Sequence, residues 1–252
     1  MWPTKRWIGV LCLVSAGLVL VIWGVKAYRE SHSEQVQHDA LPGITLNLLV
    51  RIENRLGGDR QYLLDFGQVE NSRLSLYISP DKFLTFVLID AKGEPHALQI
   101  PVGGKDIPLD RFIYLACEIG VKGQSSVMRI LVNGRQVRYE EMPFQVDIGA
   151  LDAPGGVVGS DLQGEHGARF DLVELSMNSA TYTDGDIANM LCYFQRGTPK
   201  TAYGKYSGQQ WMRVKDVGRH DLIQADPTSR PTYQTLTEED KRHWLETPCP
   251  LG

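Results

Sequence analysis

Hydrophobic and polar residues alternate in ten short runs between residues 44 and 176, as they do in half-buried β-strands. Turn-forming residues separate the runs; the clearest turn is Asn133-Gly134, which suits a type I′ hairpin because both positions need a positive φ. Runs this closely spaced leave no room for crossover helices, so the pattern predicts a mainly β fold, an antiparallel β-sandwich or jelly roll. The predicted strands are residues 44–52, 62–66, 74–78, 83–89, 97–102, 112–119, 127–132, 136–139, 157–159 and 170–176.

One helix is predicted directly after the last of these strands. Thr183 begins a segment similar to a capping box, in which its hydroxyl accepts a hydrogen bond from an otherwise unpaired backbone amide. Apolar residues then recur at helical spacing, at Ile187, Met190, Leu191 and Phe194. This apolar stripe predicts a helix that packs on the sandwich.

The amino-terminal segment contains 19 consecutive uncharged residues, 7–25, enough for a helix to cross the hydrocarbon core of a bilayer. Lys5 and Arg6 precede it without any acid, so the positive-inside rule predicts a cytoplasmic amino terminus. A cleavable signal peptide is the alternative, but the apolar run is long for one and ends without a good A-x-A-like site. We therefore expect a single-pass membrane anchor over residues 1–28, a polar stem over 29–42, and a β-domain that is periplasmic or extracytoplasmic.

The composition changes after the predicted helix. Apolar residues make up 16 of the 57 residues from 196 to 252, about 28 %, which is too few to build a core. Isolated aromatics in such a segment are typical anchors on another surface, so we expect a largely irregular, extended tail over residues 195–252 that binds partner subunits. The alternative is that the tail docks on its own β-domain. The partner-binding aromatics are Tyr203, Tyr206, Trp211, Tyr233 and Trp244.

The four cysteines form no C-x-x-C pair, which argues against zinc ribbons and c-type haem. Cys12 lies within the predicted anchor, and Cys117 is centred in an apolar run, where we expect it to be buried and inert. A disulfide between Cys192 and Cys249 would join the tail to the β-domain. The sequence leaves open whether this bond forms.

Charge argues against nucleic-acid binding. The net charge is −4, and residues 1–29 contribute four positive charges and no negative ones, so the rest of the chain carries about −8. A surface of that sign repels phosphate. We expect no nucleic-acid partner.

Several predicted strands carry motifs of a known superfamily. Residues 110–117, Asp-Arg-Phe-Ile-Tyr-Leu-Ala-Cys, are followed by a strand that leads into Val-Asn-Gly-Arg-Gln-Val at 132–137. Residues 156–159, Gly-Val-Val-Gly, and 170–175, Phe-Asp-Leu-Val-Glu-Leu, then precede the predicted helix. In this order the motifs resemble the laminin-G-like, concanavalin-A-like jelly-roll superfamily, and the resemblance covers residues 43–194.

The resemblance leaves the activity open, because the superfamily includes glycan binders, protein-interaction modules and retaining β-glucanases. Its β-glucanases carry an E-x-D-x-E or E-x-D-x-x-E strand, and no such motif occurs here. The nearest acids, Asp171 and Glu174, are three residues apart, a spacing that places them on opposite faces of a regular strand. No nucleophile elbow, H-E-x-x-H or P-loop is present. We expect no catalytic residues and no enzyme activity.

Calcium is the one cofactor that the resemblance suggests. Asp152 and Asp161 lie in Gly-rich loops that could supply oxygen ligands, although acids in such loops are more often plain turn residues. Glycan binding would need aromatic platforms, and the β-domain contains no tryptophan. Most of its tyrosines and phenylalanines fall at positions that we assign to the core.

These observations predict a non-catalytic, membrane-anchored interaction subunit, an accessory or stabilising part of a larger membrane complex such as a photosynthetic or respiratory one. Its partners would be the lipid bilayer, through residues 7–25, and other subunits, through the β-domain and the tail. The alternative is a glycan-binding, lectin-like module of the cell envelope.

Overall fold

The computed structural model describes three long stretches of the chain and several short ones near the carboxyl terminus. The chain divides into two compact units, Met1–Gln37 and His38–Gly252, and the described residues belong to the second. No helix among them is long and apolar enough to cross a membrane. The predicted anchor at residues 7–25 and most of the predicted stem lie outside the described residues. Described are residues 39–68, 70–152, 156–196, 201–202, 204–207, 212–214, 234–235 and 249.

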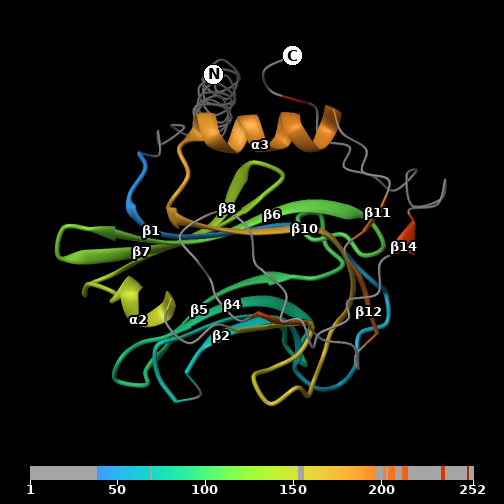
Figure 1. Cartoon of the computed structure of the whole chain (residues 1–252), viewed down its shortest axis with the longest axis horizontal. Helices are drawn as coiled ribbons and strands as arrows, with labels where there is room; N and C mark the ends of the chain where they lie inside the picture. The colour runs from blue at the N-terminus through green and yellow to red at the C-terminus, as the bar shows by residue number, and fades with distance from the viewer. Residues whose placement is uncertain are drawn as a thin grey trace, which may run out of the picture. The chain divides into compact units, whose positions relative to one another are not determined.

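The described unit is an antiparallel β-sandwich, as the alternation of apolar residues predicts. The first sheet has six strands in the order β12-β10-β1-β6-β7-β8 (Figure 1). Its central strand β1 pairs along most of its length with β10 on one side and β6 on the other. The bounds of the six are β1 Pro42–Ile52, β6 Phe112–Lys122, β7 Ser125–Val132, β8 Arg135–Met142, β10 Arg169–Ala180 and β12 Gly204–Ser207.

The second sheet also has six strands, in the order β13-β9-β2-β3-β4-β5. Strands β2 to β5 form a meander, because each pairs with the next along the chain. Strands β11 (Thr201–Ala202) and β14 (Gln234–Thr235) form a separate two-stranded sheet. The bounds in the second sheet are β2 Gln61–Gly67, β3 Arg73–Ile78, β4 Phe83–Ile89, β5 Pro95–Pro101, β9 Gly156–Val158 and β13 Met212–Val214.

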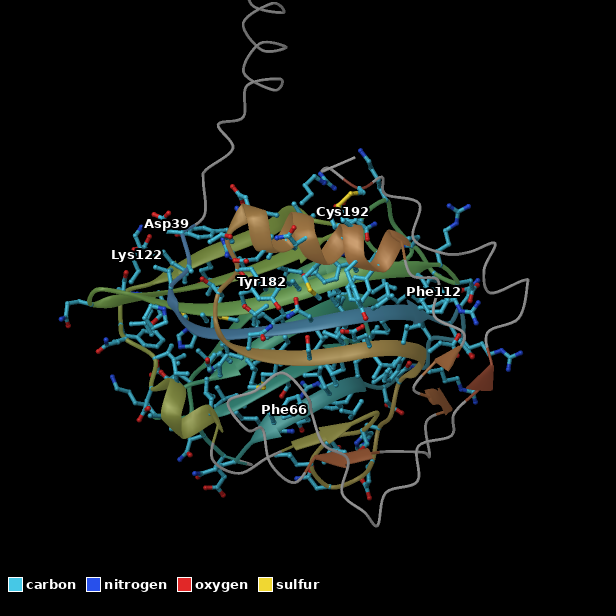
Figure 2. All side chains as sticks on the ribbon, turned by 45° about the horizontal axis from the view of Figure 1, so that its top comes forward. Asp39, Phe66, Phe112, Lys122, Tyr182 and Cys192 are labelled. Carbon is cyan, nitrogen blue, oxygen red and sulfur yellow. A yellow bond between two sulfur atoms is a disulfide. The ribbon has the colours of Figure 1, made fainter. Side chains whose placement is uncertain are left out.

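The main core lies between the two sheets and is built by period-two alternation. In β1, for example, Leu46, Leu48 and Val50 point into it and are fully buried. Phe66 of β2, labelled in Figure 2, belongs to the same cluster. Every predicted strand therefore has an observed counterpart among β1 to β10. A short helix, α2 (Ile148–Asp152), was not predicted, because five residues are too few to show a helical period.

Helix α3 (Asp184–Arg196) packs on the outer face of the first sheet (Figure 1). Ile187, Leu191 and Phe194 bury its apolar stripe in a second cluster, which confirms the prediction. Thr183 caps the helix: its Oγ1 accepts from the Asp186 amide at 3.1 Å, and Asp186 Oδ2 accepts from the Thr183 amide at 2.9 Å. The sheet residues beneath the helix are Leu49, Phe112, Tyr114, Ala116, Leu131 and Val173.

A buried ion pair fixes the segment that leads into α3. Glu118 and Arg129 face each other across β6 and β7, and both side chains are almost fully buried. Glu118 also accepts from the Tyr182 amide at 3.0 Å and from Thr45 Oγ1 at 3.2 Å. Charges of this kind are kept in a protein interior only when they are paired and hydrogen-bonded. The network thus joins the first sheet to the start of the helix.

The hairpin between β7 and β8 has the predicted turn. Asn133 and Gly134 have φ values of 50° and 78°, the two positive values that a type I′ turn needs. Asn133 Oδ1 also accepts from the Tyr114 amide at 2.9 Å. Gly134 lies against α3, because a Cβ built on it would stand 2.3 Å from Cδ1 of Leu191.

The described parts of the tail form short strands that the sequence analysis did not predict. Residues 204–207 form β12 and pair with β10, while residues 212–214 form β13 and pair with β9. Edge strands of a sheet present unpaired N–H and C=O groups, and the tail supplies partners for them. At these positions the tail docks on its own β-domain, which is the alternative given above.

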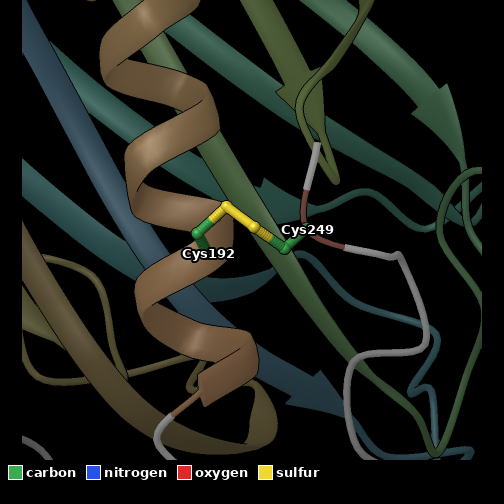
Figure 3. Close-up of a disulfide and its surroundings, with 2 residues drawn as sticks. All are labelled: Cys192 and Cys249. Atoms are coloured by element: carbon green, nitrogen blue, oxygen red, sulfur yellow. A yellow bond between two sulfur atoms is a disulfide. The ribbon is translucent and has the colours of Figure 1, made fainter. Parts of the chain in front are cut away.

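A disulfide joins Cys192 of α3 to Cys249 of the tail (Figure 3). It is the pairing that the sequence leaves open, and it closes a segment of 57 residues. Cys117 is a free, buried cysteine on β6, and burial raises the pKa of its thiol. The tail is therefore held to the domain by a covalent bond as well as by β12 and β13.

Candidate functional site

The two outer faces of the sandwich differ in character. The outer face of the first sheet is covered by α3 and is largely apolar beneath it. The outer face of the second sheet carries polar and aromatic side chains from four adjacent strands. We call this set, with one residue from the loop before β2, the polar face: Arg60, Tyr62, Asp65, Arg73, Ser75, Tyr77, Thr85 and Gln99.

Register brings one row of the polar face together. Tyr62 pairs with Tyr77, Tyr77 with Thr85, and Thr85 with Gln99, so the row crosses β2, β3, β4 and β5. Cross-strand partners share a face of the sheet, and their side chains are neighbours. Tyr62 and Thr85 are buried, Tyr77 is half-buried, and Gln99 is exposed.

Two tyrosines form one end of this row, beside an arginine from the loop before β2. The ring centroids of Tyr62 and Tyr77 are 5.2 Å apart, with 45° between the ring planes. The guanidinium carbon of Arg60 lies 4.7 Å from the centroid of Tyr77, and its Nη1 donates to Tyr62 Oη at 3.3 Å. Cation–π contact and this hydrogen bond hold an exposed positive charge over the aromatic pair. The hydrogen bond to Tyr62 raises the pKa of Arg60, and burial raises that of Tyr77.

Asp65 is the centre of a hydrogen-bond network next to this row on the polar face. Its side chain is fully buried, and its carboxylate pairs with Arg73, whose Nε donates to Oδ1 at 2.8 Å. Ser75 Oγ donates to Oδ1 at 2.6 Å, and the Leu162 amide donates to Oδ2 at 3.0 Å. Arg73 in turn lies 5.9 Å from the ring centroid of Tyr62. This network positions Tyr62 and ties the loop after β9 to the sheet.

Asp161 organises that loop. Its Oδ1 accepts from the amides of Gln163 and Glu165, at 3.1 and 2.8 Å, and its Oδ2 lies 2.8 Å from Nδ1 of His166. The hydrogen bond to Asp161 raises the pKa of His166. Asp161 thus fills the turn-forming role given as the alternative to calcium binding. Asp152 is the last residue of α2. A calcium site at Asp152 and Asp161 stays a prediction.

The predicted tail aromatics fall mostly outside the described residues, and these are Tyr203, Trp211, Tyr233 and Trp244. Tyr206 lies in β12, where its backbone pairs with Phe170. Partner binding by these aromatics stays a prediction.

The acids nearest to a glycosidase motif lie on one face of β10 rather than on opposite faces. A register shift between Leu49 and Val50 places Glu174 opposite Leu49 and Asp171 opposite Arg51. Leu49 and Arg51 share the outer face of β1, so the two acids share it as well. Asp171 is buried in an ion pair with Arg51, and burial raises the pKa of half-buried Glu174. The expectation of opposite faces was wrong because a bulge breaks the period of two.

Most aromatics of the β-domain were expected in the core. Tyr62 is buried, but it lies on the outer face of the second sheet rather than between the sheets, and Tyr77 is half-buried on that same face. Tyr77 alternates with the inward-facing Leu76 and Ile78, so strict period-two counting could have assigned it to the outer face. Tyr62 gave no such signal, because a register shift between residues 62 and 64 reverses its direction relative to Leu64.

No protein-family model and no curated protein matches the chain. Solved structures are similar in fold. They include the NanB sialidase of Streptococcus pneumoniae, with 16 % identity, a TM-score of 0.48, and coverage of 59 % of this chain and 24 % of the sialidase. The carbohydrate-binding module CBM40 of the Ruminococcus gnavus IT-sialidase, solved with α2,3-sialyllactose, has 16 % identity and a TM-score of 0.45, with 59 % and 83 % covered.

A third similar structure is the heptameric SAP-like pentraxin of Limulus polyphemus, with 13 % identity, a TM-score of 0.43, and coverage of 77 % of this chain and 87 % of the pentraxin. Of the NanB sialidase, in contrast, the chain spans only about a quarter of the length. At these identities and scores the likeness concerns the fold and carries no argument about ligands. The described domain has an antiparallel β-sandwich fold.

Proposed function

We propose that the β-sandwich is a non-catalytic, lectin-like module that binds carbohydrate on the polar face, with an acidic sugar held at Arg60. The observation that carries the proposal is the row of Tyr62, Tyr77, Thr85 and Gln99, with the guanidinium of exposed Arg60 over the ring of Tyr77.

The chemistry of the row suits a sugar. Sugar rings present C–H groups that pack on aromatic surfaces, and half-buried Tyr77 offers such a surface at the centre of the row. Sugar hydroxyls need paired donors and acceptors, which exposed Gln99 supplies. A guanidinium carries five N–H donors in a planar fork that matches a carboxylate, so Arg60 favours an acidic sugar over a neutral one.

The members of the polar face have two different roles in this proposal. Arg60, Tyr77 and Gln99 contact the ligand, because they are exposed or half-buried and their side chains are not held in the Asp65 network. Asp65 is fully buried and the Arg73 side chain is only 12 % exposed, and both act through Tyr62, which they hold in place. A ligand site with fixed side chains loses less conformational entropy on binding.

Glycan binding is preferred over the role of a subunit in a membrane complex for a structural reason. That role rests on a tail that needs a partner as its template, and β12 and β13 show parts of the tail paired with this chain's own sheets. The uncharged run at residues 7–25 still supports display of the module on the outer side of a membrane.

Isothermal titration calorimetry on the full-length protein in detergent tests the proposal. The probes are 3′-sialyllactose, which carries a carboxylate, and lactose, its neutral counterpart. We expect the acidic sugar to bind more tightly, and Arg60→Gln to weaken it by about 10- to 150-fold, as loss of a charged hydrogen bond does. Tyr77→Ala should weaken both sugars.

Arg135→Gln is the matched control, because Arg135 is an exposed arginine on β8 of the first sheet. It should leave sugar binding unchanged. The proposal fails if the wild type binds neither sugar, nor any oligosaccharide of a broad glycan array, or if Arg60→Gln and Tyr77→Ala bind as the wild type does.

A further inference from the structure

Three metal-ligating side chains meet at the hairpin between β4 and β5, away from the polar face. Asp90 follows β4, Glu94 precedes β5, and His96 is the second residue of β5. One carboxylate oxygen of each acid and one imidazole nitrogen of His96 all lie within 4.8 Å of one another. Among the residues that the structure describes, this is the one such group of three.

The turn holds Asp90 in a fixed orientation. Its Oδ1 accepts from the amides of Lys92 and Glu94, at 2.8 and 2.9 Å. The backbone closes the same loop, with the Asp90 amide donating to the Glu94 carbonyl at 3.0 Å, and Gly93 takes a φ of 84°. Because Oδ1 is used by the turn, Oδ2 is the atom that Asp90 presents to His96.

The side chain of His96 lies on the face of the hairpin that is turned toward the core, where its neighbours hold it. It pairs with Leu88, whose side chain is in the main core, and its ring packs on Phe144 with centroids 4.8 Å apart. The side chains of His96 and Asp90 are 20 % and 12 % exposed. Glu94 is exposed, so its carboxylate can adjust to a ligand while the other two stay in place.

The separation of the Asp90 and His96 side chains fits a shared metal ion better than a direct hydrogen bond. Asp90 Oδ2 and His96 Nε2 are 3.5 Å apart, at the limit of a hydrogen bond. A second Asp–His pair among the described residues, Asp161 and His166, has the usual length of 2.8 Å. Two ligand atoms at about 2.1 Å from a tetrahedral zinc ion stand about 3.4 Å apart.

A cavity adjoins the group. It has a volume of about 220 Å³, and both Asp90 and Glu94 line it. Asp147 adds a third carboxylate to the wall and Lys92 one positive charge, so the lining is negative overall, which favours a cation. Leu88, Phe144 and Leu151 make the rest of the wall partly apolar.

We propose that Asp90, Glu94 and His96 bind one divalent transition-metal ion, with zinc as the ion whose ligand preferences they fit. Two carboxylates and one imidazole provide three of its four ligands. Water from the adjoining cavity, or a donor atom of a small ligand there, provides the fourth. This site is separate from the polar face and does not depend on glycan binding.

Equilibrium dialysis of the full-length protein against Zn²⁺ tests the proposal, with the thermal midpoint as a second measurement. The wild type should bind one zinc ion, and His96→Gln and Glu94→Gln should each weaken this binding at least tenfold. Zinc should also raise the melting temperature of the wild type. Glu94→Gln is the safer variant for folding, because Glu94 is exposed and keeps its backbone contacts. In both variants the zinc-induced rise in melting temperature should shrink or vanish.

His166→Gln is the matched control, because it removes a histidine from an Asp–His pair that belongs to no group of three metal-ligating side chains among the residues that the structure describes. It should leave zinc binding unchanged and so separates this site from other histidines of the chain. Replacing zinc by Co²⁺ should give the visible absorption of a tetrahedral site in the wild type but not in Glu94→Gln. The proposal is overturned if the wild type binds no zinc, or if His96→Gln and Glu94→Gln bind it as the wild type does.

Discussion

The guanidinium of Arg73 is paired with the carboxylate of Asp65 on the outer face of the second sheet, and both side chains are buried or nearly so, at 12 % and 0 % exposed. Arg73 Nε donates to Asp65 Oδ1 at 2.8 Å, while Ser75 and the Leu162 amide use the same carboxylate. A single acid therefore connects β2, β3 and the loop after β9.

Removing this acid should destabilise the domain strongly. Asp65→Ala leaves the Arg73 charge buried without its partner, which costs about 3–5 kcal/mol in the free energy of unfolding. Asp106→Ala is the control, since Asp106 pairs with Arg135 at the surface, where a salt bridge contributes about 0–1 kcal/mol. Urea unfolding of both variants measures the difference. Equal losses would show that the Asp65 pair contributes no more than a surface pair.

A second prediction concerns the contact between a turn and α3. Gly123 and Gly134 both have positive φ, but a Cβ on Gly123 would meet no atom within 4 Å, whereas one on Gly134 would meet Leu191. Gly123→Ala should therefore lower the free energy of unfolding by about 1–2 kcal/mol, through backbone strain alone. Gly134→Ala should lower the free energy of unfolding by about 1–3 kcal/mol more, because Leu191 of α3 is packed against the first sheet and has little room to move. If melting curves show equal destabilisation of the two variants, α3 can shift away from the added methyl group without a loss of stability.

The disulfide predicts a dependence on reductant. Closing a segment of 57 residues stabilises the folded state by about 4 kcal/mol in the loop-entropy estimate. A reductant should lower the unfolding free energy of the wild type by up to that amount and leave the Cys192→Ala/Cys249→Ala variant unchanged. Cys117 provides an internal check, because its burial should protect it from alkylation in the folded protein. A wild type that is insensitive to reductant would contradict the bond.

The pair of Asp161 and His166 predicts a small pH effect. The hydrogen bond to Asp161 raises the pKa of His166 above its ordinary value of 6.5. The pair therefore adds stability that is fully present below about pH 6.5 and is lost as the pH rises through the higher folded value. Because the His166 side chain is 49 % exposed, we expect less than about 1 kcal/mol. An NMR titration of the His166 ring should give a midpoint above 6.5, and His166→Gln should abolish this part of the pH dependence.

Local signals in the sequence were enough for the architecture. Alternation identified the strands from β1 to β10, Asn133-Gly134 identified one hairpin, and the stripe from Ile187 to Phe194 identified α3. Each of these features is decided within a few residues, by the period of two in strands, by positive φ in the turn and by the helical period. Such patterns can be read from the chain without knowing what it contacts.

Both candidate sites, in contrast, were decided by contacts that the sequence does not show. Tyr62 reaches the polar face because a register shift breaks the alternation of β2, and strand pairing then places it beside Tyr77. Asp90 and His96 converge because a turn returns the chain on itself and the core fixes the imidazole. The sequence by itself determined which residues form strands and helix; the tertiary structure determined which side chains meet, because hydrogen-bond register and packing join residues whose own neighbours in the chain give no sign of the partner.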